Sequence, residues 1–310
     1  MKITKTVKDI LKYYESETIA LKTNLARLLS HGALGGSGKI AVLAVDQGFE
    51  HGPDRVFAIN PKAYDPHYIY DLATKYNLSG LAAPLGLLQA GADTYLAQVP
   101  LILKMNSNNL LMKKDASAPD QALTATIQDA LNLGCSAIGF TIYPGSDMFL
   151  HQLEELKDLA SQARQYGLVV MVWSYVRGHM PKEEETALDL ISYGAHMACL
   201  MGAHIVKVKI PNEQLYMPDA AKNIINYNMP IHLLSDRIQH VMRASLNSRR
   251  IVIFSGGEKK DDESLYNEIK AIKSGGGYGS IIGRNIFQRS EEESAELISN
   301  IVRIYLDGQK

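Results

Sequence analysis

Short apolar segments alternate with longer amphipathic segments along most of the chain. The apolar segments are rich in β-branched residues and are predicted to be buried strands, because strands covered on both faces are almost continuously hydrophobic. They cover residues 39–46, 79–84, 100–105, 135–142, 168–175, 203–210, 250–257 and 279–284. Stretches between them have helical periodicity, among them residues 119–134, 149–167 and 183–202. This alternation is typical of a parallel sheet covered by helices.

Glycines mark where several of these helices end. Gly134, Gly167 and Gly202 each stand directly before a predicted strand, as glycines at helix C-termini do. Eight such strands would close a (β/α)₈ TIM barrel, an α/β fold of about 250 residues. The competing doubly wound open sheet would carry a GxGxxG turn after its first strand. The residues there are AVDQGFEHGP, so we favour the barrel.

Two segments do not follow this alternation. Residues 1–35 precede the first strand and contain two helical patterns, which we expect to cap the bottom of the barrel or to pack against another subunit. Residues 211–248 are long for a single βα unit and should hold a loop and helices near 218–227 and 234–246. We therefore predict one barrel domain over residues 1–310, with an N-terminal helical extension and an insertion after strand six.

The composition is that of an ordinary globular protein. Hydrophobic residues make up 46% of the 310 residues and charged residues 21%, which suits a sizeable core. The net charge of -1 gives no global field to attract nucleic acid or a membrane, so neither is an expected partner. The charged start of the chain, the absence of a long apolar run and two distant cysteines favour the cytoplasm.

The segment HIVKVKIP places Lys207 and Lys209 on one face of a strand, because side chains alternate with period two. An amine attacks a carbonyl only when neutral, and an ordinary lysine has a pKa of about 10.4. Burial and a second cation both lower that pKa, so the pair indicates a Schiff-base nucleophile. The alternative is an ion pair with Asp46 or a neighbouring glutamate. The pattern does not choose between these readings, or between the two lysines.

Other polar residues stand at the carboxyl ends of the predicted strands, where barrel enzymes place their chemistry. They include Asp46, Gln47, Glu50, His51, Lys104, Asn106, Tyr143, Trp173, Ser174, Tyr175, Arg177, Ser255 and Arg284. A Schiff-base reaction needs an acid–base group, and Tyr175 or Asp46 could supply it. If these residues have no chemical role, Tyr175 is an aromatic lid over the core, Trp173 packs inside the barrel and Arg177 pairs with the acidic residues 183–185.

Glycines follow the last two strands. Gly256 and Gly257 come after strand seven, and Gly283 with Arg284 after strand eight. Backbone N–H groups of such turns bind phosphate in many barrels, so we predict a phosphate site there. The alternative for any single glycine is a turn that only requires a positive φ. The nine histidines are scattered and form no HxH or HExxH pair at a strand end, so metal-dependent chemistry is weakly supported.

Five separated motifs combine these local patterns. They are AVDQGFEHGP, MVWSYVRG, GAHIVKVK, FSGG and IIGRNIFQR, in this order. Over about residues 42–288 the chain resembles the archaeal-type class I fructose-bisphosphate aldolases of the DeoC/FbaB aldolase family. The resemblance implies a metal-independent reaction through a covalent Schiff base, with no other cofactor.

The resemblance also implies roles for single residues. Lys207, the first lysine of IVKVK, would form the Schiff base, Tyr175 would donate the proton and Trp173 would contact the substrate. Asp46 and His51 match residues near the reacting atoms and the far phosphate. The residues that match the phosphate grip are Ser255, Gly256, Gly283 and Arg284.

These inferences predict reversible cleavage of fructose 1,6-bisphosphate to dihydroxyacetone phosphate and glyceraldehyde 3-phosphate. Lys209 would keep the pKa of Lys207 low, and Asp46 would assist Tyr175. The alternatives are a Schiff-base aldolase or transferase for another phosphorylated ketose or deoxy sugar, and a non-catalytic barrel that binds a sugar phosphate. The family's habit also suggests a homo-oligomer. The sequence departs from the family at Gln47, where histidine is frequent, and at Val176, where proline is frequent.

Overall fold

The protein folds as a closed barrel of parallel strands. The computed structural model describes residues 3–111, 115–257 and 260–308. The barrel strands are β1 (Ile40–Ala44), β2 (Gly80–Pro84), β3 (Leu101–Lys104), β6 (Ala137–Ile142), β7 (Val169–Ser174), β8 (Ile205–Lys209), β9 (Ile251–Ser255) and β10 (Gly279–Ile282). The first strand pairs with both β2 and β10, which closes the sheet. The predicted (β/α)₈ barrel is confirmed, and each of these barrel strands lies inside a predicted one.

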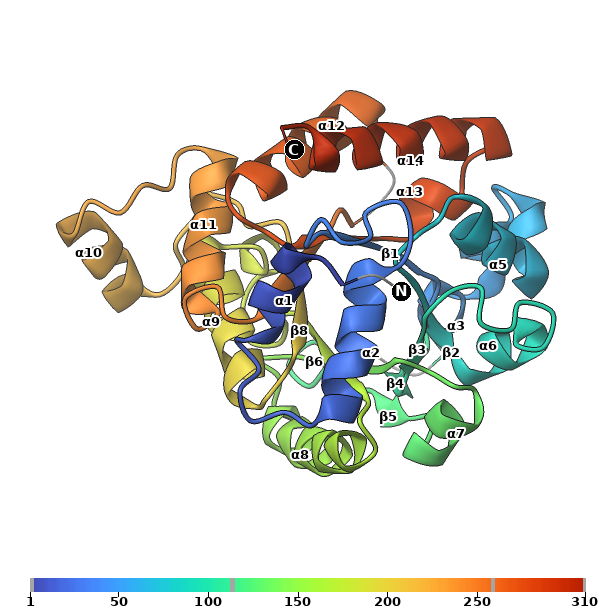
Figure 1. Cartoon of the computed structure of the whole chain (residues 1–310). Coiled ribbons are helices and arrows are strands. Elements are labelled where there is room, and N and C mark those ends of the chain that lie inside the picture. The colour runs from blue at the N-terminus through green and yellow to red at the C-terminus, as the bar shows by residue number, and fades with distance from the viewer. Residues whose placement is uncertain (1–2, 112–114, 258–259, 309–310) are drawn as a thin grey trace.

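Helices cover the outside of the barrel (Figure 1). The longer ones are α5 (Pro66–Lys75), α6 (Leu85–Gly91), α8 (Phe149–Gln165), α9 (Leu188–Leu200), α11 (Leu234–Ala244), α12 (Asp262–Ser274) and α14 (Glu291–Leu306). Short helical segments follow the first strand and others, namely α3 (Gln47–His51), α4 (Pro53–Phe57), η1 (Pro61–Tyr64), η2 (Lys182–Glu184) and α13 (Arg284–Phe287). Among the described residues, no helix is both long and apolar enough to cross a membrane.

The strands are apolar on both faces, as the sequence indicated. In β7, Val169, Met171 and Trp173 join the cluster inside the barrel, while Val170 and Val172 join the cluster between the strands and the helices. Period-two alternation therefore fixes which side chains of each strand point inward.

The prediction of a helix over residues 119–134 is mostly wrong. Residues 119–134 contain only a short helix, α7 (Ile127–Asn132), preceded by the small antiparallel pair β4 (Asn106–Ser107) and β5 (Ala122–Leu123). The helix starts at a capping box, in which the Thr126 hydroxyl accepts from the Asp129 N–H and the Asp129 carboxylate accepts from the Thr126 N–H. Such a reciprocal cap is a helix N-terminus, so the residues before it are free to form a loop over the barrel mouth.

The N-terminal extension closes one end of the barrel. It consists of α1 (Lys5–Leu11) and α2 (Ile19–Ser30), which lie across the barrel end in Figure 1. Buried side chains of this extension, including Leu21 and Leu25, belong to the same cluster as the inward residues Ile40 and Ile205 near the strand starts. Of the two predicted roles, capping the barrel bottom is confirmed, and packing against another subunit stays a prediction.

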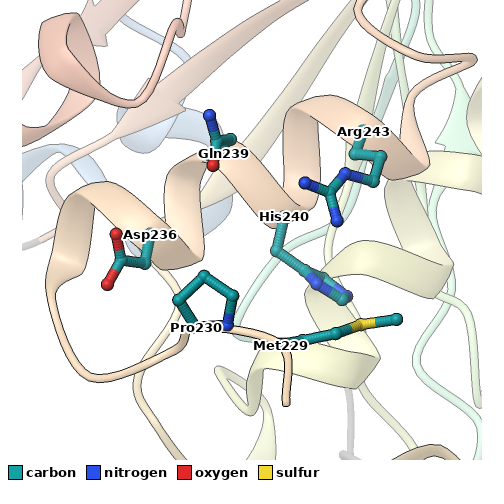
Figure 2. Close-up of a pocket in the computed structure, with 6 residues that line it drawn as sticks. All are labelled: Met229, Pro230, Asp236, Gln239, His240 and Arg243. Carbon is teal, nitrogen blue, oxygen red and sulfur yellow. The ribbon is translucent and has the colours of Figure 1, made fainter. Parts of the chain in front are cut away.

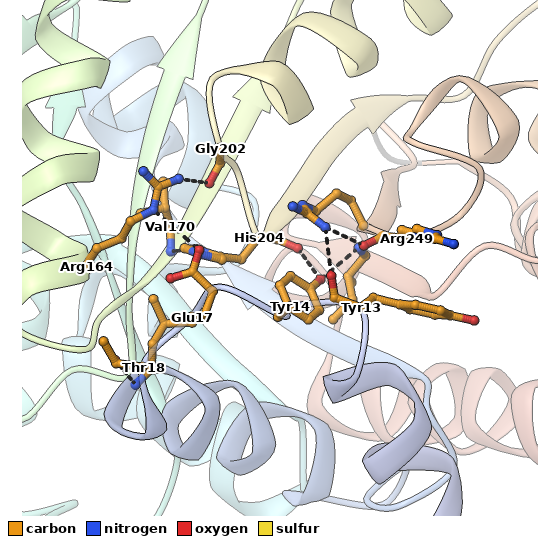
Figure 3. A network of polar contacts seen from close by, with 12 residues as sticks. Tyr13, Tyr14, Glu17, Thr18, Arg164, Val170, Gly202, His204 and Arg249 are labelled. Carbon is orange, nitrogen blue, oxygen red and sulfur yellow. Dashed lines mark hydrogen bonds and ion pairs between the residues drawn. The ribbon is translucent and has the colours of Figure 1, made fainter.

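Polar contacts hold this cap in place (Figure 3). The Tyr14 hydroxyl donates to the His204 carbonyl at 2.6 Å and accepts from the Ile251 N–H at 3.2 Å. The His204 ring, 1% exposed, accepts from the Val170 N–H at 2.9 Å and lies 3.2 Å from the Glu17 carboxylate. The chain before β1 is thus bonded to the amino ends of β7, β8 and β9, and the opposite end of the barrel is left for a site.

The predicted insertion has two parts. Helix α11 packs between α9 and α12, where a barrel helix belongs, so the additional structure is the loop after β8 with α10 (Pro218–Asn226), which stands away from the barrel in Figure 1. A small pocket lies between α11 and the preceding loop (Figure 2), lined by Met229, Pro230, Asp236, Gln239, His240 and Arg243. None of the predicted site residues belongs to this pocket.

Candidate active site

Lys207 points into the mouth of the barrel. It is the third residue of β8, whose outward residues Val206 and Val208 pack in the helix layer, and it is only 4% exposed. On the neighbouring strand its register partner is Trp173, and the Lys207 Nζ lies 5.0 Å from the centre of the indole. The inward position predicted from the alternation is confirmed.

The surroundings of Lys207 lower the pKa of its amine to about 8. Burial is the largest cause, and the Arg284 guanidinium adds to it, whereas the carboxylates of Asp46 and Glu50 act in the opposite direction. At pH 7 a pKa of about 8 leaves roughly a tenth of the amine neutral, against less than a thousandth for an ordinary lysine. The position therefore supplies a usable nucleophile.

Lys209 has another environment. Its side chain is half-buried, and its Nζ donates to the Glu185 carboxylate at 2.7 Å. The same carboxylate lies 3.7 Å from Arg177 Nε. Ion pairing, one of the two readings of the lysine pair, is thus confirmed for Lys209, as is the pairing of Arg177 with the acidic segment. Nothing supports the expectation that Lys209 holds the pKa of Lys207 low, because Glu185 balances the charge of Lys209, whereas the Arg284 cation does lower the pKa of Lys207.

Tyr175 and Asp46 lie beside the amine. Tyr175 follows β7 directly, and its ring centre is 5.5 Å from Lys207 Nζ. Burial, followed by the carboxylates of Asp46 and Glu50, raises the pKa of Tyr175, and its hydroxyl shares a hydrogen bond with Ser255. The phenol therefore keeps its proton at neutral pH. Asp46, buried at the end of β1, is the N-cap residue of α3.

The loop before α7 contributes a residue that the sequence analysis missed. Gln121 is 3% exposed, and its amide N–H₂ donates to the Glu50 carboxylate and to the Tyr143 hydroxyl, both at 2.7 Å. Its amide oxygen accepts from Lys104 Nζ at 2.9 Å. We missed it because residues 119–134 were assigned to a helix. The T-x-x-D capping pattern that starts after Gln121 is the signal that places it in a loop.

The glycine turns lie on adjacent strands, as β9 pairs with β10. Gly257 has φ 75°, which disfavours other residues, and a Cβ on Gly283 would collide with the Ala44 carbonyl. Gly256 has neither constraint, since a Cβ there would meet only ordinary contacts. Arg284 begins α13 directly after Gly283. The geometry suits an anion at these turns, and the phosphate grip stays a prediction.

His51 lies at the end of α3, half-buried, on the same side of the barrel. Burial is the main cause that lowers the pKa of His51, and the cations Arg284 and Arg55 lower it further. The imidazole and these two guanidinium groups thus share one electropositive region next to the glycine turns. Elsewhere in the described ranges, no three His, Cys, Asp or Glu side chains come together in a group that could hold a metal ion.

The comparison with protein families decides the family. Residues 40–289 match the sequence model of the DeoC/LacD family aldolases. The chain belongs to this family. All the predicted site residues fall within the matched part, which runs from the first residue of β1 to just beyond α13.

Other members of the DeoC/LacD family show how far the similarity extends. The chain is 34% identical over 253 residues to the fructose-bisphosphate aldolase class 1 of Halobacterium salinarum, covering 81% of this chain and 85% of the relative. It is 32% identical over 299 residues to a probable fructose-bisphosphate aldolase class 1 of Chlamydia muridarum, covering 92% and 84%. The solved structure of a Schiff base-forming fructose-1,6-bisphosphate aldolase superposes with a TM-score of 0.72 at 28% identity, covering 87% and 95%.

Proposed function

We propose that this chain is a class I fructose-bisphosphate aldolase that cleaves fructose 1,6-bisphosphate reversibly through a Schiff base on Lys207. The observation that carries the proposal is the Lys207 amine, which lies inside the barrel mouth with its pKa lowered to about 8. The relatives named above as class 1 or Schiff base-forming enzymes support the same chemistry. The products would be dihydroxyacetone phosphate and glyceraldehyde 3-phosphate.

The reaction begins at the ketone of the sugar. The neutral Lys207 amine adds to C2, and the carbinolamine takes up one proton and loses water, which leaves an iminium ion. When the C3–C4 bond breaks, its electron pair moves toward the iminium nitrogen, giving a neutral enamine and the aldehyde product. The proton of the C4 hydroxyl passes to a base, for which the Asp46 carboxylate is placed. The iminium is the electron sink, so the bond breaks without a metal.

Proton transfer completes the cycle. Because its pKa is held high, Tyr175 is a phenol that can give its proton to C3 of the enamine. This step restores the iminium, which water hydrolyses to release dihydroxyacetone phosphate, the free amine and the proton taken up at the carbinolamine. The proton taken up by Asp46 returns to Tyr175. Trp173 forms the wall against which the amine and the substrate lie.

Two sets of residues in this electropositive region would hold the phosphates. Ser255, Gly256 and Gly257 after β9, with Gly283 and Arg284 after β10, would bind the phosphate next to the ketone and so fix C2 against the amine. His51 would contact the far phosphate. Lys209 lies at the end of the same strand as Lys207, where Glu185 holds its amine. A homo-oligomeric assembly and a cytoplasmic location stay predictions.

Borohydride trapping tests the proposal. Treating the enzyme with fructose 1,6-bisphosphate and borohydride should add the reduced ketose phosphate to Lys207, located by peptide mass spectrometry, and Lys207→Met should abolish both labelling and turnover. Activity should survive a chelator. Comparing kcat/KM among several ketose phosphates and deoxy sugar phosphates would identify the substrate. Absence of a label on Lys207 would remove the mechanism, and binding without product would favour the non-catalytic barrel.

A further inference from the structure

A second lysine is buried in the barrel mouth beside Lys207. Lys104 is the last residue of β3 and is 1% exposed. Its Nζ lies 5.9 Å from the centre of the Trp173 indole, and Lys207 Nζ lies 5.0 Å from the same ring centre. Two amines thus contact one indole, and the proposed reaction uses only one of them. A lysine so deeply buried needs compensating contacts.

Hydrogen bonds hold Lys104 as an ammonium ion. Its Nζ donates to the Asn106 carbonyl, to Asn106 Oδ1 at 3.0 Å and to Gln121 Oε1 at 2.9 Å. These three acceptors match the three protons of an ammonium group. The acceptors are themselves fixed: Asn106 bonds both backbone groups of Thr141 that face it, through the Thr141 N–H at 2.8 Å and its carbonyl at 2.9 Å.

The Gln121 amide cannot turn away from Lys104 without losing its other hydrogen bonds. Its N–H₂ group donates to Glu50 and Tyr143, so its oxygen must face the lysine. A neutral Lys104 would leave one of the buried acceptors without a donor, which costs about 1–3 kcal/mol. Lys207 has no such fixed acceptors among the described residues, and the influences on its pKa are burial and charge alone.

Burial therefore does not distinguish the two amines, but hydrogen bonding does. Burial lowers the pKa of each to about 8, and two neighbouring buried cations disfavour each other, so the pair gives up one proton more readily than either alone. Because bonds to the charged form stabilise it, we expect the proton to stay on Lys104 and to leave Lys207.

We propose that Lys104 is a positioning residue of this active site: its ammonium ion, fixed by Asn106 and Gln121 against the Trp173 indole, keeps the neighbouring Lys207 amine uncharged and ready to attack. This inference rests on the proposed function, in which Lys207 is the nucleophile. It also assigns to Lys104 the part that the sequence had suggested for Lys209. The same cation repels the iminium ion and so favours breaking of the C3–C4 bond, which converts the iminium into a neutral enamine.

The other charges around the pair come from several elements. Those that act on the pKa of one or both lysines are Asp46 after β1, Glu50 on α3 and Arg284 on α13. The two carboxylates raise both values, Arg284 lowers that of Lys207, and the charge of Lys207 lowers that of Lys104. Repulsion between two cations is mutual, so a charged Lys104 disfavours a charged Lys207 in the same way. Tyr175 is a neutral phenol, and Lys209 is balanced by Glu185. We therefore expect the pKa of Lys207 to rise when Lys104 loses its charge.

The pH profile of kcat/KM tests this role, because a residue that served only packing would not shift it. Activity needs neutral Lys207 and falls as the pH drops below its pKa. In Lys104→Met that acid limb should move up by about one pH unit, which is about a tenfold loss on the acid side. Lys104→Gln, which keeps donors for the same acceptors without a charge, should shift the limb in the same direction even if Lys104→Met folds poorly. Lys104→Arg, which keeps the charge, should hold the limb near its wild-type position.

Lys39 provides the matched control. It is another partly buried lysine with its pKa lowered to about 8, and it donates to the Gly277 carbonyl at the closed end of the barrel. Lys39→Met should leave the acid limb in place. If both uncharged Lys104 variants keep the wild-type limb while wild-type Lys207 is trapped by borohydride, the role of Lys104 is refuted and the proposed function stands. If wild-type Lys207 is not trapped, the proposed function itself fails.

Discussion

The Trp173 indole occupies the space that a side chain at Gly139 would need. The two residues lie on the adjacent strands β6 and β7, and a Cβ built on Gly139 would fall well inside contact distance of the indole carbons Cζ3 and Cη2. Gly139 therefore leaves room for the indole, whose ring centre lies 5.0 Å from Lys207 Nζ and 5.9 Å from Lys104 Nζ.

Replacing Gly139 with alanine should displace Trp173 and disturb Lys207. Overpacking of this kind costs about 1–3 kcal/mol of stability, and we expect kcat/KM to fall at least tenfold because the amine loses its fixed wall. Thermal unfolding and steady-state kinetics measure the two effects. The control is Gly86→Ala on α6, where a Cβ meets nothing within 4 Å. Unchanged kinetics in Gly139→Ala would show that the indole does not position the amine.

The activity of the enzyme should depend on pH through Lys207. Its pKa in the folded protein is lowered to about 8 from an ordinary value near 10.5, and only the neutral amine reacts. Hence kcat/KM should be nearly level above pH 8 and fall about tenfold for each pH unit below it. A pH–rate profile with fructose 1,6-bisphosphate measures this limb. An acid limb near pH 5 would instead point to a carboxylate as the controlling group.

Replacing Tyr175 with phenylalanine should separate Schiff-base formation from turnover. The ring that packs near Lys207 remains, so the ketose phosphate should still be trapped on the lysine by borohydride. Loss of the phenolic proton should lower kcat by about 10²–10⁴-fold. The exposed Tyr166 offers the control, and Tyr166→Phe should change neither property. If Tyr175→Phe turns over normally, another group moves the proton.

The sequence predicted the barrel well because buried parallel strands leave a strong signal. Apolar runs, period-two alternation and helix-ending glycines located all the barrel strands, and the same alternation placed Lys207 inside the mouth. These signals are local, since each depends on a few neighbouring residues. The position of the candidate site at the strand ends then followed from the fold.

The electrostatic partners of the site could not be predicted in this way. Lys209 pairs with Glu185, 24 residues away, and Lys207 is influenced by Arg284 from another strand end, relations that only the closed barrel creates. Gln121 lies on a loop whose composition resembles a helix, and its contacts with Lys104 and Glu50 come from tertiary structure. Local patterns therefore identified the residue types of the site but not which charges balance each other.

The cap at the closed end of the barrel should stabilise the protein without affecting the chemistry. Tyr14→Phe removes the hydroxyl that donates to the His204 carbonyl and accepts from the Ile251 N–H (Figure 3). Both partners are buried, so each loses its bond without gaining one to water, and we expect a loss of about 1–3 kcal/mol in the free energy of unfolding. Denaturant unfolding measures this loss.

Tyr13 is the natural control for this prediction, because it is the neighbouring tyrosine with its side chain 41% exposed. Tyr13→Phe should leave stability within about 0.5 kcal/mol of the wild type. Since the cap contacts the amino ends of the strands and the candidate site lies at their carboxyl ends, Tyr14→Phe should retain the kcat/KM and the acid limb of the wild type at temperatures well below its unfolding transition. A shifted acid limb in this variant would mean that the two ends of the barrel are coupled, so that the cap affects the chemistry as well as the stability.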